Sequence, residues 1–308
     1  MIKKYAINKI TVTSMCLILL LLFYLLPVKE KEKPSIKNKQ TFEQAVYLLD
    51  SDNYVSKVIT YYDKENIINV IKYKINVLTY GLKNISEFHS LIPKSTKLND
   101  VKVYKDNVYL DFSKDLLSIS SYLEENMIEA IVYTLTEING INNIYITVEQ
   151  KKLLNYPNSK KELDYPLTRK IGINREYNIN SFDNLLETTI VFTKKSKNIK
   201  YYVPVTKIIN SNDDKINIII EELKSTVNTD ANLNGNIHDK LKLESYKING
   251  DSISLVFNDY IFNDNNTKKI NENVIYTISR SIFENYNVNE VVFNTKLEKN
   301  ITNVVKNK

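Results

Sequence analysis

Carboxylate side chains are the only groups in this 308-residue chain whose spacing suggests catalysis. Glycoside hydrolysis needs only two acids facing a sugar bond. Asp111 and Asp115 flank the exit of a predicted hairpin. Glu124 and Glu125 open the helix predicted to follow, where acidic residues commonly stabilise the first turn. Because a second hairpin of the same pattern has Val256 in place of Asp111, we interpret these carboxylates as structural and predict no catalytic residue.

Other reactive groups are sparse. His89 and His238 are the only histidines, and neither has a second histidine or a cysteine at metal-ligand spacing. Cys16 is the only cysteine, so no disulfide can form within the chain. There is no G-x-S-x-G motif, and 5 glycines are too few for a phosphate-binding loop. We therefore expect no metal, cofactor or nucleotide, and both histidines are interpreted as exposed surface residues.

The formal charge of +6 comes from the N-terminal end of the chain. Residues 1–40 hold eight lysines and two acidic residues, which leaves 34 basic and 34 acidic residues in 41–308. A nucleic-acid binder concentrates positive charge on its folded module. The neutral remainder therefore predicts no nucleic-acid partner. The hydrophobic content of the whole chain, 43%, is enough for packed cores.

An apolar segment near the N-terminus predicts a membrane anchor. Residues 11–28 carry no charge, and about 17–25 mainly apolar residues span a bilayer as a helix. Lysines flank the segment on both sides, and we place the N-terminus in the cytoplasm because the tail before the helix is so short. No small-x-small site follows Leu26, so the anchor is expected to stay uncleaved. Cys16 precedes most of the apolar run, which argues against a lipoprotein signal and favours a small apolar residue within the helix.

The remainder of the chain contains an internal repeat, "LIPKSTKLNDVKVYKDNVYLDFSKDL" answered by "KLKLESYKINGDSISLVFNDYI". A constant offset of 145 superposes Leu98 on Leu243, Val103 on Ile248, Asp106 on Asp251, Val108 on Ile253, Leu110 on Leu255 and Phe112 on Phe257. Each stretch predicts two strands around a tight turn, with Gly250 supplying backbone freedom in the second copy. Repetition on this scale indicates two copies of one structural unit.

The surrounding patterns repeat as well. An earlier hairpin is predicted in 44–64 and again in 188–209. Apolar residues at helical spacing predict two helices in each repeat. The first pair is marked by Ile67, Ile71, Ile75 and Leu78, with Gly81 as the stop, and by Ile216, Ile219, Ile220 and Leu223. The second pair is marked by Leu123, Met127, Ile131, Leu135 and Ile138, with Ser118–Ser121 as caps and Gly140 as the end, and by Ile270, Val274, Ile278 and Ile282. Final strands are predicted at 144–148 and 291–294. The predicted unit is ββ-α-ββ-α-β, present twice.

This order predicts an α+β fold of two tandem repeats, each a mixed β-sheet covered by two helices, after an N-terminal transmembrane helix. We assign 1–28 to the anchor, 29–41 to a charged linker, 42–165 to the first domain and 166–303 to the second. The polar stretch 150–174 is the expected connection between the domains. Each domain is expected to have its own core, with the two packed side by side.

Tyrosine is abundant, with 22 residues, and is enriched at protein interfaces. The stretches "YNINSFDNLL" and "ITYYDK" are candidate contact patches. An AT-rich genome raises Tyr, Asn, Ile and Lys everywhere, and this compositional interpretation accounts for the tyrosines without naming a binding hot spot.

Three short motifs of the first repeat point to a known family. They consist of Ile92, Pro93, Thr96 and Leu98; of Leu110, Asp111, Phe112 and Ser113; and of Val132, Thr134, Leu135, Thr136 and Glu137. With these residues the first repeat resembles the GerMN domain of GerM-type sporulation and germination proteins, which has a segment I-P-x-x-T-x-L, a strand pair ending in V-D-F/L-S, and a helix carrying V-x-T-L-T-E. The second repeat matches less well, with His238 and Asp239 at the proline motif and residues 276–279 in place of the helix core. The motif residues look like turn formers, caps and core rather than an active site.

The resemblance implies a noncatalytic protein of a spore-forming bacterium. It implies a single-pass protein of the cell membrane whose C-terminal domains lie outside the cytoplasm, in the intermembrane space of the sporulating cell. The expected partners are other extracytoplasmic sporulation proteins of the assembly that joins mother cell and forespore. GerM proteins are often lipoproteins, and this chain departs from them by its predicted transmembrane helix. The alternative is a cell-envelope protein that binds or hydrolyses peptidoglycan.

Overall fold

The computed structural model describes residues 14–15, 17–19, 41–63, 66–83, 85–197, 199–224, 232–264, 269–295 and 303–307. The chain divides into two units, 1–40 and 41–308. In the first unit the described residues 14–15 and 17–19 are helical, and the rest of the predicted anchor and of residues 29–40 lies outside the described residues. No helix among the described residues is both long and apolar enough to cross a membrane.

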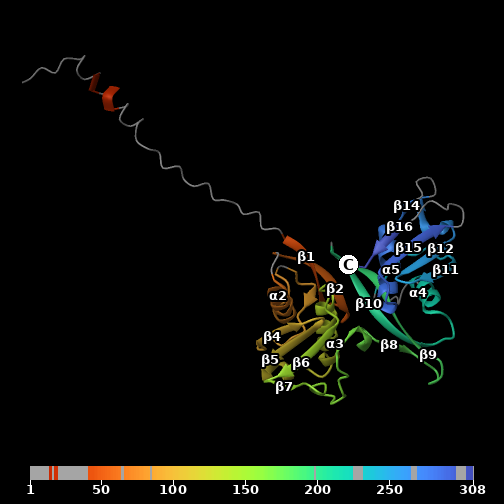
Figure 1. The fold of residues 1–308 in the computed structure, drawn as a ribbon, viewed down its shortest axis with the longest axis horizontal. Coiled ribbons are helices and arrows are strands. Elements are labelled where there is room, and N and C mark those ends of the chain that lie inside the picture. Colours follow the sequence, from red (N-terminus) through yellow and green to blue (C-terminus); the bar gives the residue numbers. More distant parts are fainter. Residues whose placement is uncertain are drawn as a thin grey trace, which may run out of the picture. The chain divides into compact units, whose positions relative to one another are not determined.

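The second unit contains both repeats, and each has the predicted order of elements (Figure 1). The first repeat comprises β1 (Thr41–Asp50), β2 (Val55–Asp63), α2 (Ile67–Tyr80), β3 (Phe88–His89), β4 (Leu98–Tyr104), β5 (Asn107–Phe112), η1 (Lys114–Ser118), α3 (Glu124–Thr136), β6 (Asn143–Val148) and β7 (Lys151–Lys152). The connection contains η2 (Arg169–Ile171), and β8 (Glu176–Asn178) follows it. The second repeat comprises β9 (Leu185–Ser196), β10 (Ile199–Asn210), α4 (Lys215–Lys224), β11 (Leu243–Asn249), β12 (Ser252–Phe257), η3 (Asp259–Ile261), β13 (Phe262–Asp264), β14 (Lys269–Ile270), α5 (Glu272–Asn285), β15 (Glu290–Thr295) and β16 (Asn303–Lys306).

The later hairpin of each repeat confirms the offset of 145. Both hairpins turn through two residues, and the first of these has a left-handed backbone in each case, with φ of 55° at Lys105 and 56° at Gly250. Both also carry an irregularity at the same place in the ladder, after Leu98 and after Leu243. A β-bulge re-aims a strand locally, so its recurrence marks a shared backbone course rather than a shared composition.

Each later hairpin belongs to a four-stranded mixed sheet. The strand orders are β4-β5-β6-β7 and β11-β12-β15-β16. The pairs β5–β6 and β12–β15 are parallel, and α3 and α5 provide the crossovers that parallel neighbours require. The alternating buried residues of β5 and β12 point toward the helices, as the period of two predicts.

The helices form where their apolar stripes predicted, with corrections at their ends. The α2 helix begins after Asn66, whose side chain accepts a hydrogen bond from the Asn69 amide at 3.0 Å, and it ends at Gly81 with φ of 78°. The predicted capping of α3 by Ser118–Ser121 is wrong, because Leu123 is the N-cap residue and makes no side-chain bond.

Two helical assignments were too long. Ile138 and Gly140 lie beyond α3, which ends at Thr136 with Glu137 as its C-cap residue. Ile270 belongs to the short strand β14, and α5 begins after Asn271. In both cases apolar residues of the adjoining segment continued the helical spacing by chance.

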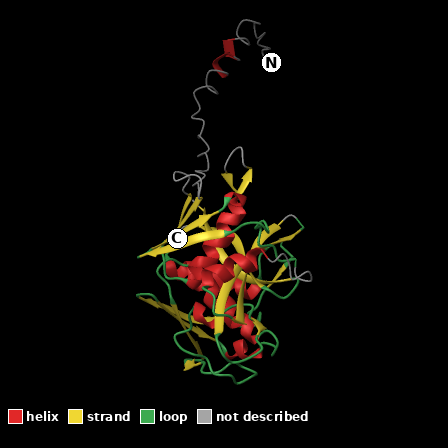
Figure 2. Cartoon of the chain, turned by 90° about the vertical axis from the view of Figure 1, so that its right-hand side faces the viewer, coloured by secondary structure: helices red, strands yellow, loops and turns green. Residues whose placement is uncertain are grey.

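The helices lie between two layers of strands (Figure 2). One layer is the four-stranded sheet of the repeat, and the other is its earlier hairpin, since α3 contacts β1 and β2 as well as β6. The two earlier hairpins join in one sheet of order β3-β1-β2-β10-β8, with β9 paired to β10. Lys57 of β2 lies opposite Tyr202 of β10.

The buried apolar residues of both repeats form one continuous cluster. The expectation of separate cores is therefore corrected: each four-stranded sheet covers its own helices, but the central sheet and the core are common to both repeats. The sequence did not reveal this because pairing between β2 and β10 depends on residues far apart in the chain.

The connection 150–174 is built into this core. Leu153, Tyr156, Leu163, Leu167 and Ile173 are buried despite the polar character of the stretch. The predicted boundary between the two domains, at residues 165 and 166, stays a prediction. Segments on both sides of it pack on the same folded unit.

Helix-to-strand bonds relate the two repeats. The Tyr47 amide of β1 donates to the Thr134 hydroxyl of α3, and the Val191 amide of β9 donates to the Ser281 hydroxyl of α5, each at 2.9 Å. Tyr47 and Val191 are therefore equivalent positions. Their neighbours across the hairpins, Lys57 and Pro204, are equivalent too.

This equivalence gives the central sheet a local two-fold relation. If Lys57 corresponds to Pro204, then Val55 corresponds to Tyr202, two residues earlier on each strand. The observed pairing of Lys57 with Tyr202 implies its counterpart, Val55 with Pro204. Asn174 marks this second pair, because its side-chain amide donates to the carbonyls of Val55 at 2.9 Å and Pro204 at 2.7 Å. Each repeat thus presents the same strand to the other, as in an isologous interface.

Replacing Asn174 tests this connection. Its carbonyl oxygen also accepts from the Val55 amide at 2.8 Å, so Asn174→Ala leaves three backbone groups without a partner. We expect the free energy of unfolding in urea to fall by about 2 kcal/mol more than in Asn53→Ala. Asn53 is the matched control because it is exposed and has φ of 66°, beside 48° for Asn174, so both alanines carry the same left-handed strain. Equal losses in the two variants would contradict the assigned role.

Candidate functional site

The densest polar cluster of the described residues lies where the two repeats meet. Glu137 at the end of α3 and Glu284 in α5 are equivalent positions, 147 residues apart like Thr134 and Ser281. Arg169, from the connection, pairs with both carboxylates: its Nη2 is 2.8 Å from Glu137 Oε1, and its Nη1 binds Glu284 Oε1. One guanidinium therefore joins the same position of two repeats.

The remaining donors of Arg169 are also used. Its Nε donates to the Thr136 hydroxyl at 2.9 Å, and Nη2 donates to the Tyr133 carbonyl at 3.3 Å. The guanidinium carbon lies 4.6 Å from the centroid of the Tyr133 ring. The planar fork of arginine suits such a site, since several fixed donors meet oxygen acceptors and an aromatic face at once.

Glu137 receives two further partners. Lys57 Nζ is 2.8 Å from its Oε2, and the Tyr47 hydroxyl donates to its Oε1 at 2.9 Å. Burial alone would raise the pKa of Glu137, but the charges of Lys57 and Arg169 outweigh it and hold the pKa far below the ordinary value. Two cations thus compensate two carboxylates in the junction, which is the condition for keeping charges out of water.

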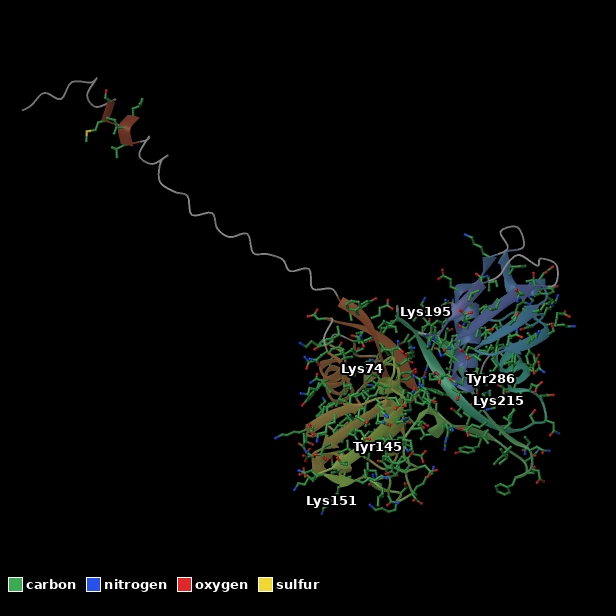
Figure 3. All side chains as sticks on the ribbon, in the orientation of Figure 1. Lys74, Tyr145, Lys151, Lys195, Lys215 and Tyr286 are labelled. Carbon is green, nitrogen blue, oxygen red and sulfur yellow. The ribbon has the colours of Figure 1, made fainter. Side chains whose placement is uncertain are left out.

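Lys74 of α2 lies beside this cluster and is 1% exposed (Figure 3). Its ammonium donates to the Ala45 carbonyl of β1. Burial lowers the pKa of Lys74 to about 8, although the charge of Glu137 opposes the shift. Lys74 therefore joins α2 to β1 rather than completing an ion pair.

A second polar cluster joins the hairpin of the first repeat to β9 and β10. Asp50 Oδ2 lies 2.9 Å from Lys194 Nζ and accepts from the Tyr201 hydroxyl at 3.2 Å. Its Oδ1 accepts from the amides of Asp52 and Tyr54, which fix the β1–β2 turn. Asp50 and Lys194 are 1% and 3% exposed, so this pair lies inside the junction and is closed to a substrate.

The carboxylates considered for catalysis have structural roles. Asp111 accepts from the Thr147 hydroxyl at 2.5 Å and from the Gln150 amide at 2.7 Å, and Asp115 accepts from the Ser113 hydroxyl at 2.9 Å. Burial would raise the pKa of Asp111, but these hydrogen bonds hold it below its ordinary value. The two acids thus fix the ends of β6 and η1.

The helical pair also has separate uses. Glu124 is 2% exposed and accepts from the amides of Asn158 and Ser159 at 2.6 and 2.9 Å. Glu125 forms an exposed pair with Lys161 at 3.2 Å. Glu124 therefore binds the interdomain connection, and Glu125 binds Lys161 of the same segment.

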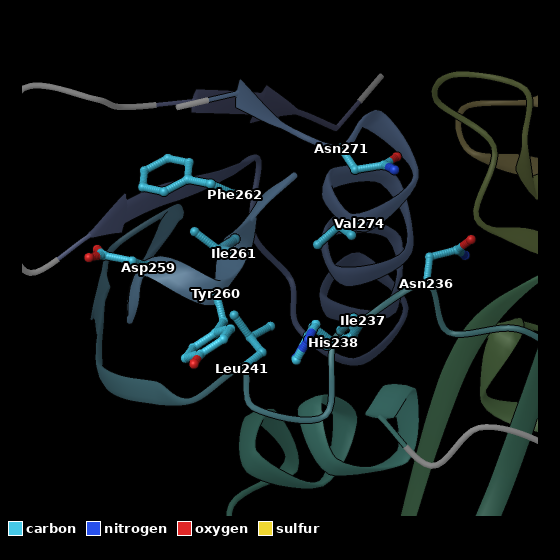
Figure 4. Close-up of a pocket in the computed structure, with 10 residues that line it drawn as sticks. All are labelled: Asn236, Ile237, His238, Leu241, Asp259, Tyr260, Ile261, Phe262, Asn271 and Val274. Carbon is cyan, nitrogen blue, oxygen red and sulfur yellow. The ribbon is translucent and has the colours of Figure 1, made fainter. Parts of the chain in front are cut away.

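A hollow lies in the second repeat, between η3 and the start of α5 (Figure 4). Its volume is about 410 Å³, and its lining is Asn236, Ile237, His238, Leu241, Asp259, Tyr260, Ile261, Phe262, Asn271 and Val274. Asp259 and Asn236 point away from its centre in this view. His238 accepts from the Lys240 amide at 3.0 Å and stacks on Tyr260, and Asn271 caps α5.

The polar groups around the hollow therefore serve the local fold. Both histidines are exposed, and no group of three His, Cys, Asp or Glu side chains among the described residues could hold a metal ion. The described parts of the chain bring no nucleophile, base and oxyanion donor together, and what they do bring together is the junction of the repeats.

Comparison with known proteins identifies relatives of this chain in sequence and in fold. Residues 45–154 match the family model described as "Germane: Sporulation and spore germination". The spore germination protein GerM of Bacillus subtilis (strain 168) is 28% identical over 262 residues, which are 82% of this chain and 70% of that protein. The solved structure of the tandem GerMN domains of the sporulation protein GerM from Bacillus subtilis superposes with a TM-score of 0.75, at 24% identity, over 83% of this chain and 92% of that one. The chain has the fold of tandem GerMN domains and resembles GerM over most of its length. This relationship supports a role in sporulation or germination.

Within the first GerMN domain, the helix motif V-x-T-L-T-E supplies the junction. Thr134 accepts from β1, Thr136 accepts from Arg169, and Glu137 pairs with Arg169 and Lys57. These three residues therefore have structural partners within the fold. They hold the first hairpin on α3 and the second GerMN domain on the first.

Arg169, Glu284, Asp50 and Lys194 were not recognised from the sequence. One signal was available for Arg169: the chain has only three arginines among 42 basic residues. Where lysine is so strongly favoured, a retained arginine indicates a site that needs its fork of donors. Nothing in the local sequence marks Asp50 or Lys194, which meet only through the central sheet.

Removing Arg169 tests the junction. Arg169→Ala leaves the Glu137 and Glu284 carboxylates without their shared partner, and we expect the free energy of unfolding to fall by about 3–5 kcal/mol. Arg169→Lys keeps the charge without the fork and should fall between this variant and wild type. The control is Lys161→Ala, which removes an exposed pair and should cost less than about 1 kcal/mol. A loss of that small size in Arg169→Ala would rule out the role assigned to the junction.

Glu129 of α3 gives a pH-dependent prediction. It is 6% exposed, accepts from the Asn174 amide at 3.1 Å, and burial raises its pKa from 4.5 to about 7. Between these values the folded chain keeps a proton that the unfolded chain has lost, so this group lowers stability as pH rises, by at most about 1.4 kcal/mol per pH unit.

Urea unfolding of Glu129→Gln from pH 5 to 7.5 measures this effect. The glutamine cannot ionise, so we expect stability of the variant to decline less with rising pH than that of wild type. Glu137 does not confuse the comparison, because its lowered pKa affects stability only as pH falls below the ordinary glutamate range. Parallel pH profiles for the two proteins would show that Glu129 is not the responsible group.

Proposed function

We propose that this chain is a noncatalytic, membrane-anchored protein that works outside the cytoplasm during endospore formation or germination. Its function is to bind other extracytoplasmic sporulation proteins of the assembly that joins mother cell and forespore. Relationship to a spore germination protein over 82% of the chain supports the setting. The anchor is the uncharged segment 11–28, which places 41–308 outside the cytoplasm.

The observation that carries the noncatalytic part is the use of the candidate carboxylates. Asp111, Asp115, Glu124 and Glu125 each bond to a neighbouring element of the fold. A carboxylate that catalyses glycoside cleavage faces its partner across space for a substrate, about 5–9.5 Å wide. The acids of this chain face their own backbone and side chains instead.

The buried junction supports the binding part of the proposal. Arg169, Glu137 and Glu284 tie two domains into one body with a common core. Domains within one chain usually meet through smaller, more polar interfaces and move relative to each other. Two domains held at one geometry present a surface that loses little conformational freedom when a partner binds.

A C-terminal tag that fluoresces outside the cytoplasm tests the proposal in sporulating cells. We expect signal only after asymmetric division, gathered at the membrane around the forespore. The control is the same fusion beginning at residue 34, which lacks the predicted anchor and should lose membrane localisation. Uniform signal around vegetative cells would contradict the proposed setting.

An assay with purified protein tests the alternative, a protein that binds or hydrolyses peptidoglycan. Purified residues 34–308 contain the whole folded unit 41–308 and should neither cleave purified peptidoglycan nor sediment with it. Cleavage that is abolished in Asp111→Asn or Glu124→Gln would replace the proposed function with the peptidoglycan alternative.

A further inference from the structure

An exposed apolar patch lies on the segment that leads from β8 into β9. Tyr177, Ile179, Phe182 and Leu185 are 62%, 39%, 90% and 44% exposed. Single exposed apolar residues are ordinary, but four of them within nine residues are a local concentration of exposed apolar side chains, and exposed apolar surface of this kind marks binding regions. We call residues 179–185 the Phe182 loop. The loop lies within the stretch "YNINSFDNLL", residues 177–186, which the sequence suggests as a candidate contact region.

The loop has a fixed backbone. Asn210, at the end of β10, accepts from the Asn180 amide at 2.8 Å and the Ser181 amide at 3.4 Å. Its side-chain amide donates to the carbonyls of Ser181 at 3.0 Å and Asp183 at 2.6 Å. The Ser211 amide donates to the Asn184 carbonyl at 3.1 Å. Hydrogen bonds from Asn210 and Ser211 thus fix the backbone of the loop.

This combination is unusual for a segment whose only task is connection. A connecting loop needs no large apolar side chain at its tip, and a fold that used Phe182 would bury it. Here the backbone bonds hold the loop while the ring stays in water. A preorganised loop loses little conformational freedom on binding, so the gain from burying the ring is kept as affinity.

Charge around the loop distinguishes between two kinds of partner. Residues 179–185 contain the exposed Asp183 and no basic residue, and the adjoining turn after Ser211 adds the exposed Asp213 and Asp214 before the half-buried Lys215, which leaves a net charge of −2 on these four side chains. Segments that insert apolar residues into a membrane surface carry lysine or arginine for the anionic lipid headgroups. An acidic border repels such a surface and suits a protein pocket with basic residues at its edge.

We propose that the Phe182 loop is a docking element, which inserts the Phe182 ring into an apolar pocket of another protein whose rim carries lysine or arginine facing Asp183. The inference rests on the proposed function as an interaction protein and adds the surface and the chemistry of the partner.

The test begins with the full chain carrying the photocrosslinker p-benzoylphenylalanine at position 182 in sporulating cells. The crosslinked protein is identified by mass spectrometry, purified separately, and its affinity for the purified wild-type and variant chains is measured. We expect Phe182→Ser to bind about tenfold to a hundredfold more weakly, as loss of one buried aromatic anchor predicts. Asp183→Lys should weaken binding at low salt and lose its effect at high salt.

Tyr122→Ser is the matched control. Tyr122 is 77% exposed and lies in the first GerMN domain, away from β8 and β9 in the chain. It should bind with wild-type affinity. All three variants alter exposed positions, so their thermal unfolding midpoints should equal that of wild type.

Three results would overturn the inference: no protein adduct at position 182, an adduct whose purified protein binds Phe182→Ser as well as wild type, or binding of the wild-type chain to vesicles of phosphatidylglycerol and phosphatidylethanolamine that Phe182→Ser loses. In the second case the partner binds through another face, so the docking role of the Phe182 loop is rejected and the proposed function is kept. Absence of any sporulation partner with the crosslinker at 182 and at 122 would count against both.

Discussion

The folded unit depends on charge compensation at the junction of its two domains. Glu137 and Glu284 lie in largely buried positions at the ends of equivalent helices, where an unpaired carboxylate would strongly disfavour the folded state. Arg169 compensates both, and Lys57 completes the balance. Because each partner comes from a different element, the ions are paired only when α3, α5, β2 and the connection are all in place. The charge pairs therefore select one arrangement of the domains, whereas the apolar core alone would accept several.

The central sheet imposes the second constraint. Joining β2 to β10 gives the two hairpins one layer, and the helices of each domain pack beneath their own half of it. Asp50 and Lys194 lie within this layer and Asn174 lies at its seam, so polar groups specify the register across which the apolar core is continuous. The connection 150–174 is part of the same construction, since its first half caps α3 through Glu124 and its second half carries Arg169 and Asn174.

Local patterns predicted most of the elements. Alternation in β5 and β12, the tight turns at Lys105 and Gly250, and the apolar stripes of the helices all rest on residues close in sequence, and the offset of 145 identified the repeat. Errors occurred where neighbouring elements continued a pattern, as at Ile270.

The shared sheet and the junction were beyond such methods. Lys57 and Tyr202 are 145 residues apart, and nothing around either residue indicates the other. The Phe182 loop shows the opposite case: the sequence marked the stretch, but only the exposure of the ring and the bonds of Asn210 separate it from ordinary composition.

The two-fold relation between the domains has a consequence for how such a chain arises. It is the relation between subunits of a symmetric dimer, reached within one polypeptide. In a dimer of separate chains, any side chain at the axis is supplied twice and must share the space with its own copy. In a fused, duplicated chain a side chain can be supplied once, as Arg169 is, which contacts the same glutamate position in both halves. Fusion also keeps the halves together at a high effective concentration. Each half is then free to change its outer surface independently, and the Phe182 loop, which leads into the second half, is one such change.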